Sequence, residues 1–361
     1  MRKDIRTVTV GVDGSRAGLD AADWAAREAE RRRLTLRLLH AGGEPTTSVP
    51  LSGAGPLSAS GPLSGSGRGR APASGPGPAC ASEPASTSEP ASGSVPRPRV
   101  RSRPVPGRSA VPARDLQRGI LDRAAVQLSY AHPTLEIAAR RTDTPALPAL
   151  LEAATESETV VLGSRGFNGY TRFLVGSVAL AVAAGAACPV VLVRAGDLPQ
   201  DERVPVDSGD DTTGPARTPY RPVVLGLDPS DPADELIGYA FDAAGVRAAP
   251  LHVVHTWTLP PLLPPPRDRA TGVGAPGDTA AQQDARERSL AAVLEPWRHK
   301  FPETEVSEEV VYGHAGHHLL KASTRAGLLV VGRSTADKRL GRAAHSLLHR
   351  STCPVAVVPH D

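Results

Sequence analysis

Short apolar runs alternate with longer segments of helical periodicity along much of the chain. In the N-terminal part, the apolar runs predict strands over residues 8–12, 34–40, 135–139, 159–163 and 189–194. The segments between them predict helices over residues 17–32, 114–130, 146–154 and 177–184, the first preceded by Ser15, a residue type that caps helices. Runs such as VVLG and PVVLV are apolar on both faces, which is typical of parallel sheets covered by helices on both sides. The pattern therefore predicts a doubly wound α/β fold.

The same pattern occurs twice along the chain. TVTVGVDGS near the N-terminus is matched by PVVLGLDPS from Pro222, and CPVVLVR from Cys188 is matched by CPVAVVPH from Cys353. This duplication predicts two tandem domains, residues 1–195 and 220–361, joined by a polar linker over residues 196–219. The last strand of each domain is a valine-rich sheet edge, and we expect the two edges to cover each other within one chain, forming a pseudo-dimer. Val193 and Val357 would then lie within reach of a cysteine crosslink.

One segment interrupts the first domain. Residues 42–113 consist mainly of Pro, Ser, Gly and Ala and contain few large apolar side chains. Such a composition does not offset the entropy lost on folding, so we expect this insertion to be disordered.

Composition and missing motifs narrow the classes of function. The chain has 361 residues, a net charge of +3 and 40% hydrophobic residues, enough to bury two cores. It has no apolar run long enough to cross a bilayer and no signal-peptide pattern at its start, so we expect a cytoplasmic protein without membrane or nucleic-acid partners. The motifs Gly-x-x-x-x-Gly-Lys-[Ser/Thr], Gly-x-Ser-x-Gly and His-Glu-x-x-His are absent from the sequence, which argues against a P-loop ATPase, an α/β-hydrolase and a zinc protease.

The stretch GSRGFNGYTRFLVGS, Gly163 to Ser177, combines several glycines with the end of the fourth strand. Open α/β sheets bind ligands beyond the carboxyl ends of their strands. Without Cβ atoms at Gly163, Gly166 and Gly176, phosphate oxygens could approach the main chain, and the following helix start offers unpaired N–H groups. Ser177 could cap that helix and donate to a phosphate, and Arg165 adds positive charge. The alternative is that these glycines only close turns.

The spacing of this stretch resembles a known family signature. Gly163, two residues, Gly166, nine residues and Gly176-Ser177 match the nucleotide-binding signature of the universal stress protein family, and Val-Asp-Gly-Ser from Val12 and Cys-Pro-Val-Val from Cys188 support the resemblance. The resemblance implies a five-stranded parallel sheet of order 3-2-1-4-5 in each domain. It also implies ATP, with or without Mg²⁺, at the carboxyl ends of strands one and four.

The resemblance further implies individual roles around an adenine nucleotide. The Asp13 carboxylate would accept a hydrogen bond from a ribose hydroxyl, the Ala41 backbone would read the adenine edge, and Leu162 would pack on the base. The implied site consists of Gly11, Val12, Asp13, Ala41, Leu162, Gly163, Arg165, Gly166, Gly176, Ser177 and Val178. One departure is Thr142-Asp143-Thr144-Pro145, where family members usually carry a glycine before the proline.

The second domain departs further from the signature. In GRSTADKRLGRAAHS, from Gly332, the spacing is four residues shorter, Thr335 replaces the middle glycine and Arg342 replaces the capping serine. We therefore expect one nucleotide per chain, bound in the first domain. The cluster His314, His317 and His318 invites a metal interpretation but lacks a carboxylate or cysteine beside it in the sequence.

These observations favour an ATP-binding module of the stress response or of signalling, in which nucleotide occupancy sets conformation or the choice of a protein partner. No catalytic residues are predicted. Two alternatives stay open: a slow ATP hydrolase of the same fold, and a nucleotide-free scaffold whose insertion recruits partners. Further homo-oligomers also stay open.

Deletion of residues 42–113 should leave a folded protein with nearly unchanged thermal stability, because the entropy of closing a surface loop changes slowly with its length. Thermal unfolding of the full chain and of the deletion variant measures this. Loss of soluble expression in the deletion variant would contradict it.

Overall fold

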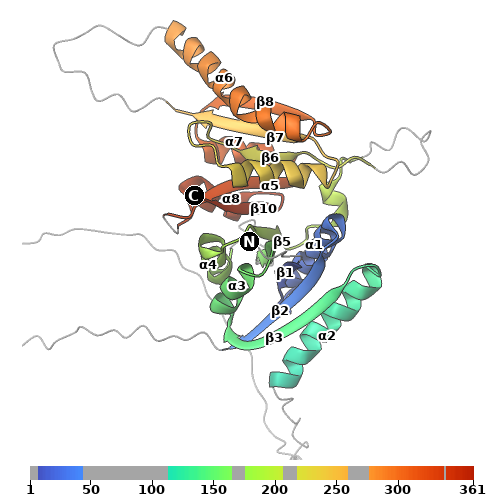
Figure 1. Ribbon diagram of the computed structural model, residues 1–361. Helices are drawn as coiled ribbons and strands as arrows, with labels where there is room; N and C mark the ends of the chain where they lie inside the picture. The colour runs from blue at the N-terminus through green and yellow to red at the C-terminus, as the bar shows by residue number, and fades with distance from the viewer. Residues whose placement is uncertain (1–6, 44–112, 165–174, 206–217, 259–275, 337–338) are drawn as a thin grey trace, which may run out of the picture. The chain divides into compact units, whose positions relative to one another are not determined.

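The two repeats contribute their strands to one sheet. The computed structural model describes residues 7–43, 113–164, 175–205, 218–258, 276–336 and 339–361. Over these ranges the sheet has ten strands in the order β3-β2-β1-β4-β5-β10-β9-β6-β7-β8 (Figure 1). All strand pairs within each repeat are parallel, and the order within each is 3-2-1-4-5. The predicted fold class is confirmed. The predicted insertion lies almost entirely outside the described residues.

The first half of the chain, up to the end of β5, contains five strands and four helices in its described residues. The strands are β1 Thr7–Gly11, β2 Thr35–Gly43, β3 Ile137–Pro145, β4 Thr159–Ser164 and β5 Val190–Arg194. The helices are α1 Arg16–Arg32, α2 Ala113–Ala131, α3 Ala146–Ala154 and α4 Ser177–Gly185. Each matches a predicted element, and the clear difference is β3, predicted over residues 135–139. This strand continues to Pro145 because it stays paired with β2 as far as Gly43.

The second half of the chain, from β6 onward, repeats this succession. The strands are β6 Val223–Gly226, β7 Leu251–Trp257, β8 Val306–Tyr312, β9 Leu328–Ser334 and β10 Val355–His360. The helices are α5 Asp234–Gly245, α6 Pro276–Lys300, α7 Ala315–Ser323 and α8 Arg342–Arg350. None of the helices in the described ranges has both the length and the hydrophobicity needed to cross a bilayer.

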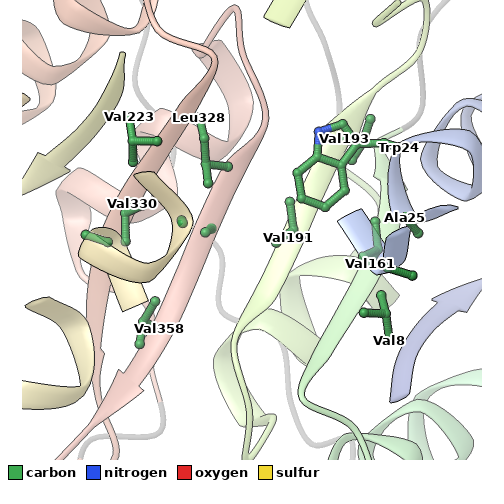
Figure 2. Packing of buried hydrophobic residues seen from close by; sticks show 14 of the residues in the cluster. Val8, Trp24, Ala25, Val161, Val191, Val193, Val223, Leu328, Val330 and Val358 are labelled. Carbon is green, nitrogen blue, oxygen red and sulfur yellow. The ribbon is translucent and has the colours of Figure 1, made fainter. Parts of the chain in front are cut away.

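Successive side chains of a strand point to opposite faces of the sheet, and they form two hydrophobic cores, one on each face. Val8 and Val10 of β1 belong to a buried cluster that also contains Trp24 of α1 and residues of α2, α5 and α6. Figure 2 shows part of this cluster around Trp24. Val160 and Leu162 of β4 point to the other face, into a cluster built with α3, α4, α7 and α8. Cys188 and Cys353 are buried in this second cluster, and burial raises the pKa of each thiol to about 12.

The two halves meet through an antiparallel pair of strands, β5 and β10. Val355 lies opposite Leu192 and Val357 lies opposite Val190. The predicted covering of one edge strand by the other is confirmed. The proposed crosslink between Val193 and Val357 is wrong, because the register offsets these residues by three positions, roughly 10 Å along the strand, beyond the reach of a disulfide.

A buried cluster of charges joins α1 to the second half on one face of the sheet. The Glu28 side chain is 1% exposed, and its carboxylate accepts hydrogen bonds from Arg247 at 2.5 Å, Arg32 at 2.6 Å and Arg31 at 3.2 Å. Arg32 also forms an ion pair with Asp242 of α5. Burial by itself would raise the pKa of Glu28, but the three guanidinium groups lower it to about 2. A fully buried carboxylate therefore stays ionised.

The start of the predicted linker contributes a carboxylate, Glu202, to the same cluster of buried charges. A short 3₁₀ helix, η1, spans Pro199–Glu202, and the Glu202 side chain is 2% exposed. Its carboxylate accepts from Arg27 at 2.9 Å and from Arg31, both on α1. Glu202 thus anchors the first part of the predicted linker, residues 196–219, to the first half.

Replacing Glu28 with Gln should reduce the free energy of unfolding at neutral pH by about 3–5 kcal/mol, because the buried Arg247 guanidinium would lose the carboxylate it contacts and Arg31 and Arg32 would each lose one of theirs. The folded-state pKa is lowered from its ordinary value near 4.5, so the stabilisation is complete above that pH and is lost as the pH falls towards about 2. The difference between wild type and Glu28→Gln, measured by urea unfolding, should therefore shrink over this interval.

The matched control is Glu152→Gln, which removes an exposed ion pair with Arg140 and should cost less than about 1 kcal/mol. Equal losses for the two variants, or a difference that grows on acidification, would contradict the assignment.

Candidate functional site

A cleft of about 250 Å³ opens at the carboxyl ends of β1 and β4. Nine of the eleven residues predicted from the sequence line it: Gly11, Val12, Asp13, Ala41, Leu162, Gly163, Gly176, Ser177 and Val178. The other two, Arg165 and Gly166, lie outside the described residues. Ser15, Gly18, Leu39, Ala146, Leu150 and Ala179 complete the lining. Strands and helices far apart in the sequence thus place the predicted residues around one cavity.

Asp13 follows β1 in a tight turn at the rim of the cleft. Its Oδ1 accepts hydrogen bonds from the Ser15 backbone N–H at 2.9 Å and from the Ser15 hydroxyl at 2.5 Å. Gly14 adopts a left-handed φ of 82°, which a glycine tolerates without strain. The Ser15 oxygen in turn accepts from the Gly18 N–H at 3.1 Å and caps α1, as predicted. Both bonds to Asp13 use Oδ1, so Oδ2 is available to accept from a ligand.

The base of the cleft is apolar. A Cβ on Gly11 would come within 2.7 Å of Leu162 Cδ2 and 3.3 Å of Leu150 Cδ2, so these leucine side chains lie directly over the end of β1. Leu39 of β2 and Ala146 of α3 extend this surface. An aromatic ring could bury its face on this surface, to which Leu162 contributes.

One polar contact organises the adjoining main chain. His40 Nδ1 lies 2.6 Å from the Val12 carbonyl, and because a carbonyl only accepts, Nδ1 carries the proton. His255 makes the equivalent contact with the Leu227 carbonyl at 3.1 Å in the second half. Sequence reasoning missed His40, although a histidine at the same place in LLHA and VVHT was the signal that could have identified it.

Gly163 has a different role from the predicted one. A Cβ there would lie 2.9 Å from the Gly18 N atom and closer still to the Ala17 carbonyl. The missing side chain therefore allows β4 to pack against the first turn of α1. Gly163 still lines the cleft, but the direction of its absent Cβ is towards the helix and not towards a ligand.

The start of α4 forms the polar end of the cleft. Gly176 is the N-cap residue, with φ −65° and ψ 152°, and no side chain caps the helix. The prediction that Ser177 caps α4 is wrong, because Ser177 is the first residue of the helix. The backbone N–H groups of a first helical turn have no partner within the helix. We call this turn, Gly176 to Val178, the cradle.

The corresponding region of the second half differs in its contacts. The Asp228 turn is kept, with Oδ1 accepting from the Ser230 N–H at 3.0 Å and its hydroxyl at 2.8 Å. However, His360 Nε2 lies 2.7 Å from the position of a Cβ on Gly332. Thr335, at the place of the middle glycine, donates its N–H to the His360 carbonyl at 2.8 Å. The end of β10 therefore lies beside Gly332 and bonds Thr335, the positions that match Gly163 and Gly166 in the sequence.

A larger hollow, of about 340 Å³, lies where β5 meets the start of β10. Several of its hydroxyls are already donors to carbonyls of the protein: Ser323 to Leu320, Thr324 to Lys321 and Thr352 to Ser323. The described residues hold no group of three His, Cys, Asp or Glu side chains that could bind a metal ion. The cleft beside β1 and β4 is the better candidate site.

Comparisons with known proteins agree with this architecture. A model of the universal stress protein family matches residues 4–59, 94–194 and 219–359. Universal stress protein Rv2005c of Mycobacterium tuberculosis is 30% identical over 218 residues, which cover 58% of this chain and 65% of that relative, so the match spans less than two thirds of the relative's length. Universal stress protein Rv1996 of the same organism is 26% identical, covering 98% of this chain and 96% of its own.

A solved structure shows the same fold. The crystal structure of a universal stress protein from Archaeoglobus fulgidus has a TM-score of 0.56 and 13% identity, covering 99% of this chain and 100% of that chain.

Replacing Gly163 with Ala should destabilise the protein by about 1–3 kcal/mol or more, because the new Cβ would overlap main-chain atoms that cannot move independently of α1. The matched variant Gly332→Ala meets the His360 ring, a side chain that can turn aside, and should cost less. Urea unfolding of both variants measures the difference, and an equal or smaller loss in Gly163→Ala would refute the packing role.

Proposed function

Because the chain belongs to the universal stress protein family, we propose that it binds one adenine nucleotide, ATP, in the cleft of its first half. The observation that carries the proposal is the cleft itself, which has an apolar base beside β1 and β4, a carboxylate at one rim and the unpaired N–H groups of a helix start at the other. A nucleotide presents a matching order of groups: an apolar ring, a sugar with hydroxyls and an anionic chain.

The cradle would hold the phosphates. The N–H groups of its residues at the start of α4, together with the positive end of the helix dipole, favour an anion. The Ser177 side chain is exposed and free of a capping bond, so its hydroxyl could donate to a phosphate oxygen.

Asp13 would hold the ribose. Its Oδ1 is occupied by Ser15, which fixes the carboxylate, and Oδ2 could accept from a ribose hydroxyl. Leu162 and Leu150 would pack on the adenine, while the Ala41 backbone, at the end of β2, would lie along its edge.

The same lining favours binding over hydrolysis. Asp13 is the one ionisable side chain among the described residues of the cleft. Phosphoryl transfer to water needs a group that positions the nucleophile and charges that stabilise the transition state, whereas Asp13 is assigned to the ribose. We propose a nucleotide-dependent module of the stress response or of signalling. A slow ATP hydrolase would require turnover of radiolabelled ATP faster than in buffer.

Isothermal titration with ATP should give one site per chain, because the glycine spacing of the second half is four residues shorter and Thr335 and Arg342 stand where the first half has Gly166 and Ser177. Mass spectrometry of ligand released from protein purified without added nucleotide should detect an adenine nucleotide. A stoichiometry near two would show that the second half also binds, and no binding at all would remove the proposal.

Two variants locate the site. Asp13→Ala should weaken ATP binding roughly ten- to a hundredfold, the value of one hydrogen bond to a charged group. Gly176→Val should place a bulky side chain at the helix start and abolish measurable binding, whereas Gly341→Val, at the matching N-cap of α8 with open space around it, should bind like wild type. Undiminished binding in Gly176→Val would contradict the assignment to the first half.

A further inference from the structure

We propose that the second half of the chain positions the cradle of the first half, with His349 as the positioning residue. This inference rests on the proposed nucleotide site. It gives the half with the incomplete glycine signature a defined task, which is to hold α4 in the orientation that the phosphates require.

His349 of α8 contacts the chain directly in front of the cradle. Its Nδ1 accepts a hydrogen bond from the Val175 backbone N–H at 3.4 Å. Val175 is 6% exposed and belongs to the same buried cluster as Leu347 and Leu348 of α8. The next residue, Gly176, is the N-cap of α4. A side chain of the second half therefore satisfies a buried backbone donor one residue before the proposed phosphate site.

The second half also holds the other end of α4. The Arg333 guanidinium of β9 donates from Nη2 to the Ala186 carbonyl at 2.6 Å, and Ala186 is the C-cap residue of α4. Arg333 is buried, so this bond is shielded from water. Because His349 contacts the chain at the start of α4 and Arg333 contacts its end, the second half fixes the position of α4.

The contact at the helix start is one-sided. The repeat aligns Gly176 with Gly341, which places Ala184 at the position of His349 and Leu340 at the position of Val175. An alanine side chain has no acceptor, so the reverse hydrogen bond cannot form. At the helix ends, by contrast, support is mutual, because Arg194 of the first half donates to the Ser351 carbonyl at the C-cap of α8 at 2.8 Å.

This arrangement has a physical consequence for binding. A cradle whose N–H groups already face the ligand loses little conformational freedom when the ligand arrives. If Val175 lost its acceptor, Val175 and the start of α4 would gain alternative conformations, and binding would have to order them. Nucleotide affinity should therefore depend on a side chain that contacts no nucleotide.

The test compares three variants of the full chain. His349→Leu keeps the bulk and removes the acceptor, whereas His349→Asn keeps an acceptor oxygen near the position of Nδ1. His299→Leu is the matched control, because His299 is an exposed histidine of α6 whose partner is Glu295 on the same helix. Isothermal titration with ATP gives affinity, amide hydrogen exchange of Val175 by NMR gives the state of the bond, and circular dichroism verifies folding.

His349→Leu should bind ATP roughly three- to tenfold more weakly, the loss expected for one uncharged hydrogen bond, and should exchange the Val175 amide faster. His349→Asn should restore both, and His299→Leu should match wild type. Unchanged affinity in His349→Leu overturns the inference even where exchange changes, as does an Asn variant as weak as Leu, since packing alone would then explain the loss.

The two proposals fail in distinguishable ways. Should wild type bind no ATP, the proposed function fails, and Val175 exchange then decides the positioning role alone. Faster exchange in His349→Leu that returns to normal in His349→Asn would support it, and unchanged exchange would refute it.

Discussion

The antiparallel pairing of β5 with β10 is the constraint from which most of the structure follows. Each half ends in a valine-rich strand, and such a strand at a free sheet edge exposes both apolar side chains and unpaired backbone groups. Joining the two strands removes both edges at once and merges two five-stranded sheets into one. The outer edges of the merged sheet are β3, which carries Arg140 and Arg141, and β8, which carries Glu308 and Glu309. Charged side chains at these edges disfavour pairing with another chain.

The strand pairing brings helices of the two halves together on both faces of the sheet. The contacts between these helices are ionic on one face and mostly apolar on the other. On one face, ion pairs join α1 to α5 and to the turn that follows α5. Glu28 of α1 lies there among guanidinium groups from both halves. A buried charge is tolerated there because its counter-charges come with it. On the other face the contact is mostly apolar, between the cluster around α4 and the cluster around α8, with single hydrogen bonds at the helix ends. The ionic face makes the relative placement of the halves specific, since each guanidinium must find its carboxylate.

The apolar face is also where the proposed site lies. The cleft opens beside α4, and α4 is the helix that the second half contacts at both ends. The two halves differ in sequence at this place: the first has the glycine signature beside the cleft, whereas the second has a shorter glycine spacing, with Thr335 and Arg342 in place of a glycine and a serine. The second half then serves as a fixed neighbour of α4.

Much of the fold was predictable from local patterns in the sequence. Apolar runs and helical periodicity placed the elements of the first half, Ser15 marked the start of α1, and the repeated strand motifs predicted two similar halves, whose strand order the family resemblance implied. Nine residues of the glycine signature and its implied surroundings were also brought to one cleft. These features depend on residues close in sequence, or on a rule that all parallel α/β sheets share.

Tertiary structure decided what depends on residues far apart in the sequence. One partner of Glu28 is Arg247, 219 positions away, and no local pattern marks that pair. The strand register that excludes a Val193–Val357 contact, the use of Gly163 for packing on Ala17, and the contact of His349 with Val175 all arise from how whole helices and strands lie against each other. Periodicity states which face of an element is buried, but it does not state which side chain of another element will meet it there.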